Sequence, residues 1–525
     1  MKQNKIKILY GAILLIGIAA MSSCSQSFLD IKPKGQVLEN NYYATPDEAL
    51  AGVVAAYAPM GITCSNSGTT YCAFEGLANA ASDECYSGGG SAQDQVDWTA
   101  MNNMSLLAPA LMPSTLWNVN FMGVNYSNII LSKLDGVPGL SDADKARYTA
   151  EAKFLRAYYY FHLARWFGNV PLFTAPPAPS DLQTAKQSTP SEVYAQIEQD
   201  LTDAIPDLPV TITSPATENG RATQGAAKAL LGKVYLYAQK WTDAANILKD
   251  VNGTPGGANQ YGYQLMANYG NIFTQKFNSE SIFEIQYTSS QNYGDWGNLG
   301  SVRGNVYSIM VGPRNYVQVK STAPNLMAGW GFTPVSTDMY DAMVVNGVYD
   351  PRYKYTIYNM DSLMAAGACT YDQNSNNFPA YETKYYMVKF APLMQYIGSG
   401  GDQRLNISID YIEIRLADTY LMEAEALMQG GGDQSRAQAL LNAVRARVGL
   451  PPVPVSIDAI KNERHLELAT EGHRFFDLVR WGDADKVLNH MENGVSKNFV
   501  VGKSEILPIP LAELTNTAMV QNPGY

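Results

Sequence analysis

Three glutamates in the C-terminal part of the chain have a spacing that could support chemistry. Glu463, Glu467 and Glu471 lie four residues apart, so on a helix their carboxylates would share one face. Paired carboxylates are the catalytic groups of glycosidases, but in those enzymes they flank the substrate from different elements. Like charges at this spacing repel unless cations lie between them, so we expect an internal ion-pair network that clamps helices. The nearby cations are Arg464, Arg474 and Arg480.

Other catalytic and metal-binding patterns are not found. The four histidines form no HExxH motif and no Ser/His/Asp spacing. Asp142-x-Asp144 lacks the third ligand and the glycine of a calcium loop, and there is no phosphate loop or dinucleotide fingerprint. The sequence therefore predicts no catalytic residue, no metal and no cofactor. The histidines are His162, His465, His473 and His490.

Aromatic residues offer a binding chemistry instead. Sugar rings present C–H faces that stack on flat aromatic rings, while their hydroxyls need amide or guanidinium partners. Three tryptophans, Trp98, Trp296 and Trp330, lie in loop-like sequence, and the other four lie in helical sequence, where we expect them in the core. Packing of the loop tryptophans in a small core of their own is the alternative. The predicted ligand-binding residues are Trp98, Asn102, Tyr293, Trp296, Arg314 and Trp330.

The N-terminus carries an export signal. Lys2, Lys5 and Lys7 precede an apolar run at residues 8–21, which is shorter than the roughly 20 residues of a membrane span. Small residues then precede Cys24, as a lipoprotein signal peptidase requires. We expect residues 1–23 to be a signal peptide, Cys24 to be acylated, and residues 24–40 to form a lipid tether. An unprocessed anchor helix is the alternative.

The net charge limits the possible partners, and the cysteines limit the possible disulfides and metal sites. The net charge of −11 argues against nucleic acid, because phosphates need cationic partners. An exported protein can form disulfides, and three pairings are open among the four remaining cysteines. Their spacing fits no zinc site. These cysteines are Cys64, Cys72, Cys85 and Cys369.

The elements that must position these groups are mostly helices. Thr45 and Pro46 predict a helix start, and residues 147–166 have apolar side chains with a period of 3.6. The pattern Leu-Gly-x-x-Tyr at 231–235, followed by Ala-x-x-x-Leu at 244–248, is typical of tetratricopeptide helix pairs, and it recurs more loosely at 416–441. We predict a mainly α fold in one domain, residues 41–525. Its helix pairs occupy about 114–250 and 408–490, and a loop-rich, partly β insertion occupies about 253–408.

Several ordered motifs make the chain similar to SusD/RagB nutrient-binding lipoproteins over essentially its whole length. They are the Cys24 lipobox followed by FLD at 28–30, EAKFLRA at 151–157, WFG at 166–168, EGHRFFDLVRWG at 471–482, LPIP at 507–510 and QNPGY at 521–525.

This resemblance implies a non-catalytic, lipid-anchored protein of the outer membrane that faces the cell exterior. It implies binding of an oligosaccharide and its delivery to a SusC-like, TonB-dependent β-barrel. Uptake of an oligopeptide, as in RagB-like proteins, is the alternative.

Overall fold

The computed structural model describes residues 43–62, 73–91, 93–290, 296, 302–371, 383–492 and 495–525. Cys24, the tether, Tyr293, Cys64 and Cys72 lie outside these residues. Cys85 and Cys369 are described and are buried free thiols, so neither of these two takes part in a disulfide. Within the described part of the chain, no helix is both long enough and apolar enough to span a bilayer.

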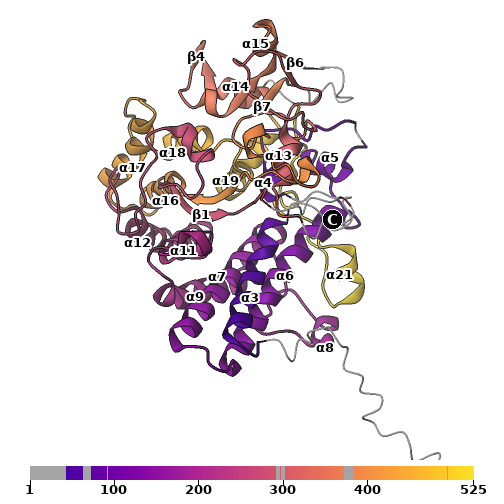
Figure 1. Ribbon diagram of the computed structural model, residues 1–525, viewed down its shortest axis with the longest axis vertical. Coiled ribbons are helices and arrows are strands. Elements are labelled where there is room, and N and C mark those ends of the chain that lie inside the picture. The colour runs from indigo at the N-terminus through magenta and orange to yellow at the C-terminus, as the bar shows by residue number, and fades with distance from the viewer. Residues whose placement is uncertain are drawn as a thin grey trace, which may run out of the picture.

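Long helices form the N-terminal part, at the lower end of Figure 1. The Thr45 side chain accepts a hydrogen bond from the Glu48 amide, and Pro46 occupies the first turn, which confirms the predicted helix start. The predicted helix at 147–166 lies within a longer one that Ser141 caps, with Asp142 and Asp144 in its first turn. These carboxylates stabilise the positive end of the helix dipole. The long helices here are α3 (Pro46–Tyr57), α6 (Leu111–Lys133), α7 (Asp142–Phe167) and α9 (Pro190–Ala204).

The predicted helix pairs are present. In the first pair, α11 (Gln224–Tyr237) packs on α12 (Trp241–Asn252), and in the second, α16 (Leu416–Gln429) packs on α17 (Gln434–Arg447). Helix α12 also contacts α16, so the two pairs stack although about 160 residues of sequence separate them. A Cβ at Gly232 would lie 2.5 Å from a Leu248 side-chain carbon, which is why the motif needs glycine there. Two further helices, α18 (Ile457–Glu467) and α19 (Arg474–Trp481), follow.

The insertion begins and ends at one antiparallel strand pair. Strand β1 (Ser281–Ile285) pairs with β8 (Tyr411–Arg415), with Glu284 opposite Ile412, and every residue of β8 is buried. Strand β1 therefore belongs to the junction between the insertion and the helices. The insertion itself lies at the upper end of Figure 1. Its strand pairs are β2 (Val317–Gln318) with β6 (Cys369–Thr370), β3 (Val344–Val345) with β4 (Val348–Tyr349), and β5 (Ile357–Asn359) with β7 (Tyr385–Met387).

Short helices complete the fold and correct one expectation. Residues 61–97 are rich in glycine, serine, threonine and asparagine, which predicts a long loop, but their described part contains a buried helix, α4 (Phe74–Ala81), and the start of α5 (Val96–Asn102). Glycine and serine suggested a loop, yet the apolar side of α4 packs into the main core. The other short helices are α8 (Pro179–Gln183), α10 (Pro215–Glu218), α13 (Val306–Val311), α14 (Thr337–Met343), α15 (Met360–Ala365), α20 (Ala484–Leu488) and α21 (Leu511–Asn516).

Candidate ligand-binding site

Two of the predicted tryptophans, Trp296 and Trp330, lie together on the insertion. Their ring centroids are 5.9 Å apart with an interplanar angle of 38°. Both side chains are partly buried, so each keeps some surface open to solvent. We call this pair, with the charged groups around it, the tryptophan platform.

Backbone packing fixes the position of Trp330. The segment around it runs against the end of α13, where the Trp330 amide donates to the Ile309 carbonyl at 3.0 Å. Next to it, Gly329 and Gly312 approach so closely that a Cβ on Gly329 would lie 2.4 Å from the Gly312 Cα. Arg314, also predicted, donates from Nη1 to the Trp330 carbonyl at 2.8 Å. Arg314 thus joins the platform by holding its backbone.

Two charged residues that the sequence did not suggest complete the platform. The Trp296 Nε1 donates to Asp402 Oδ2 at 2.6 Å, and the Arg404 guanidinium lies 5.3 Å from the centre of the Trp296 ring. Arg404 Nε also donates to Asp402 at 2.9 Å. Hydrogen bonds from Arg404, and to a lesser degree from Trp296, lower the pKa of Asp402 to about 2, so this carboxylate is charged at neutral pH. Asp402 and Arg404 lie about 100 residues after Trp296, and only their proximity in the fold reveals them.

Trp98 and Asn102 do not belong to the platform. The Trp98 side chain is fully buried on α5 and lies 5.7 Å from the Phe332 ring, while Asn102 is buried and accepts from Lys497 Nζ at 2.6 Å. Neither side chain offers surface to a ligand, so their position assigns them to the core. Tyr293 lies outside the described residues.

Of the four tryptophans in helical sequence, two are buried and two are partly buried. Trp117 and Trp166 are buried in the main core, as expected, and Trp241 packs against it partly buried. Trp481 is partly buried, and its Nε1 donates to Glu425 at 2.8 Å.

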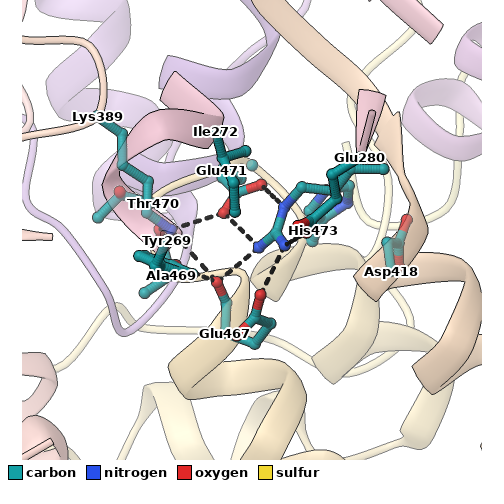
Figure 2. A network of polar contacts seen from close by, with 12 residues as sticks. Tyr269, Ile272, Glu280, Lys389, Asp418, Glu467, Ala469, Thr470, Glu471 and His473 are labelled. Atoms are coloured by element: carbon teal, nitrogen blue, oxygen red, sulfur yellow. Dashed lines mark hydrogen bonds and ion pairs between the residues drawn. The ribbon is translucent and has the colours of Figure 1, made fainter. Parts of the chain in front are cut away.

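The glutamate stripe forms the predicted ion-pair network, drawn in Figure 2 around Glu467, Glu471 and Lys389. At its centre, Arg415 of β8 donates to Glu471 at 2.8 Å and to Glu467 at 2.6 Å. Lys389 Nζ donates to Glu471 at 2.6 Å, and Arg352 Nη1 donates to Glu467 at 3.0 Å. Because Arg352 and Lys389 come from the insertion, the network ties the insertion to the C-terminal helices.

The partners and the helix geometry differ from what we expected. Helix α18 ends at Glu467, so Glu471 lies in the loop beyond it and not on the same helix face. The cations that neutralise the stripe come from distant segments. The three nearby arginines pair elsewhere: Arg464 with Asp418 and Asp477, Arg474 with Asp83, and Arg480 with Glu425 and Asp477.

The arrangement of the tryptophan platform suits ligand binding. Its carboxylate, Asp402, is ionised, so it cannot act as the proton-holding acid that a glycosidase needs. The platform offers apolar rings beside charged hydrogen-bonding groups, which fits a polar ligand with apolar faces.

Comparison with known proteins places the chain in a family. Residues 279–525 match the model of the SusD family, and residues 27–236 match a model described as "Starch-binding associating with outer membrane". A solved structure named "Laminarin binding SusD-like protein" is 45% identical with a TM-score of 0.84, covering 92% of this chain and 100% of that one. The chain belongs to the SusD family.

Two further SusD-family proteins match this chain at lower identity. Surface glycan-binding protein A from Bacteroides thetaiotaomicron, solved in complex with laminarihexaose, is 27% identical with a TM-score of 0.78, over 91% of this chain and 99% of that one. SusD-like protein P25 of Formosa agariphila is 26% identical over 78% of this chain and 80% of its own length. The mainly α fold that the sequence predicted, with helix pairs and a partly β insertion, is confirmed and is the SusD fold.

Proposed function

We propose that this SusD-family protein is a non-catalytic, lipid-anchored receptor that binds a glycan of the laminarin type at the tryptophan platform. The observation that carries the proposal is the pair of indoles 5.9 Å apart with Asp402 and Arg404 beside them. Rings of this kind stack on the C–H faces of sugars, and the charged groups can accept from and donate to sugar hydroxyls. The choice of glycan draws on the relative named for laminarin binding, which is 45% identical.

Calorimetric titration of the mature chain with laminarihexaose tests this proposal. We expect Trp330→Ala to weaken binding about tenfold or more, a loss of about 1.4 kcal/mol, because the stacking surface is removed. Trp330→Phe, which keeps an aromatic face, is the matched control and should retain most of the affinity. Unchanged binding by the alanine variant would place the ligand elsewhere.

The same titrations distinguish the alternative ligands. Maltohexaose tests a starch-type glycan, and a mixture of casein peptides tests the oligopeptide alternative. Binding of the peptides with no response to either glycan would overturn the proposal. Release of shorter sugars from laminarihexaose during prolonged incubation would contradict its non-catalytic part.

Delivery to a SusC-like, TonB-dependent transporter is the second part of the proposal. Its support is the lipobox at Cys24 and a family model whose description names association with the outer membrane. A tether over residues 24–40 would reach roughly 50 Å if extended, at about 3.3 Å per residue. Such tethering raises the local concentration towards the millimolar range, so a modest interface would stay occupied.

A pull-down tests this partner. Mild detergent extraction followed by capture on a C-terminal tag should recover a β-barrel protein of about twice this chain's mass. Recovery of the lipoprotein alone, under conditions that preserve other outer-membrane complexes, would count against the transporter partner.

A further inference from the structure

A cleft of about 610 Å³ opens where the C-terminal end of α3, the middle of α6 and strand β1 meet. This volume lies within the range of small-molecule binding sites. No residue assigned to the tryptophan platform lines it. We call it the helix cleft, and its lining includes Val54, Tyr57, Met122, Tyr126, Asn219 and Gln286.

The rim of the helix cleft carries exposed apolar surface. Val54 on α3 is 54% exposed and Tyr126 on α6 is 37% exposed. Met122 lies one helical turn before Tyr126 and also lines the cleft. An aromatic ring and aliphatic side chains that converge on one hollow are typical of a ligand site.

Three polar side chains in the cleft are available to hydrogen-bond a ligand. The side-chain amides of Asn219 and Gln286 and the hydroxyl of Tyr126 have no hydrogen-bond partner among the described residues. An amide both donates and accepts, as a phenol does, so together these groups can satisfy hydroxyls that do the same. Alternating hydroxyls beside C–H faces are the surface of a sugar.

The charges at the cleft are largely neutralised. Arg221 is paired with Glu151 at 2.6 Å and with Glu218 at 3.0 Å. Burial, and secondarily the neighbouring Asp410, raises the pKa of Glu284, a lining residue of the cleft, to about 8, so this carboxyl is mostly protonated at neutral pH. Arg303 lies at the edge of the cleft and is exposed. A neutral, hydroxyl-rich ligand therefore fits better than an anion or a charged peptide.

We propose that the helix cleft is a second oligosaccharide-binding site, so that one molecule holds a glycan at two separate places. The inference rests on the proposed function for the choice of glycan. Two weak sites on one molecule would bind a long glycan more tightly than a short one, because the second contact forms at a high effective concentration.

Calorimetry on the mature chain with laminarihexaose tests the second site. We expect two molecules of ligand per chain in the wild type, and one in Trp330→Ala and in Tyr126→Ala. The double variant should bind none. Gln286→Ala removes an exposed amide without touching the core, and it should weaken the same site as Tyr126→Ala. Tyr349→Ala, an exposed tyrosine on strand β4 at the far end of the insertion, is the matched control and should keep both sites.

The outcomes separate the two proposals. One ligand per wild-type chain, with Tyr126→Ala and Gln286→Ala both unaffected, overturns the second site and leaves the proposed function standing. No binding by the wild type overturns both. A thermal unfolding temperature that matches the wild type confirms for each variant that lost binding is not lost folding.

Discussion

Replacing Arg415 with methionine tests whether the ion-pair network holds the insertion in place. The Arg415 side chain is 1% exposed and donates to three carboxylates, those of Glu280, Glu467 and Glu471. Methionine fills much of the same volume but leaves these carboxylates without their central cation. Removing one partner of a buried ion pair costs about 3–5 kcal/mol.

The cations that remain in Arg415→Met determine where in that range its loss of stability should lie. Arg447 and Arg352 still neutralise Glu467, and Lys389 still neutralises Glu471. We therefore expect Arg415→Met to lower the free energy of unfolding by about 3 kcal/mol, the lower end of the range.

Urea unfolding at pH 7, followed by tryptophan fluorescence, measures this loss. Lys145→Met is the matched control, because its pair with Asp135 is solvent-exposed, with side chains 40% and 84% accessible. Exposed pairs contribute about 0–1 kcal/mol, so the control should be nearly neutral. If the free energy of unfolding of Arg415→Met lay within about 1 kcal/mol of the wild-type value, the ion-pair network would not be what holds the insertion in place.

Acid should remove the same stabilisation. Burial alone would raise the pKa of Glu467, but Arg447, Arg415 and Arg352 lower it well below its ordinary value of 4.5. A folded-state pKa below the unfolded value gives stability that is fully present above about pH 4.5 and is lost as the pH falls. The gap in stability between wild type and Arg415→Met should therefore narrow below that pH.

Three further predictions concern packing, a buried lysine and the anchor. Gly232→Val should lower the free energy of unfolding in urea by about 1–3 kcal/mol, because its Cβ would lie 2.5 Å from a Leu248 carbon. Gly136→Ala, where a Cβ would have no atom within 4 Å, is the control and should leave the stability unchanged. Equal stabilities of the two variants would contradict the close helix contact. Burial lowers the pKa of Lys497 to about 7, whereas its ordinary value is 10.5. Between these two pH values the unfolded chain holds a proton on Lys497 that the folded chain lacks. The free energy of unfolding therefore rises with pH over this range, by up to about 1.4 kcal/mol per pH unit. Lys497→Met should lack this slope in urea titrations at pH 7 and 9, and an unchanged slope would assign it to another group. Cys24→Ala should abolish labelling with radioactive palmitate and release the protein from membranes, and equal labelling would end the lipoprotein proposal.

Local signals in the sequence predicted the helices well. The Thr45 cap, the 3.6-residue period at 147–166 and the small residues at 231–244 act within one or two helical turns, so a single segment carries them. The short helices α4 and α5 were missed because their glycine- and serine-rich surroundings resemble a loop. Only contacts with the main core make them helical.

Long-range partners could not be predicted in the same way. The glutamate stripe indicated a network, but three of its cations, Arg352, Lys389 and Arg415, lie 52 to 115 residues from the glutamates that they contact, and nothing near Glu467 or Glu471 points to them. Likewise, Trp296 and Trp330 could be selected by residue type, but whether an indole faces solvent or the core is decided by distant packing. The same criterion selected Trp98, which is buried.

A crystal structure of the mature chain with laminarihexaose tests the central claim most directly. Binding at the tryptophan platform predicts a glucose ring stacked on Trp296 or Trp330, with a hydroxyl hydrogen-bonded to Asp402 or Arg404. A well-ordered hexaose bound only at other places, with both indoles free of ligand, would contradict the account.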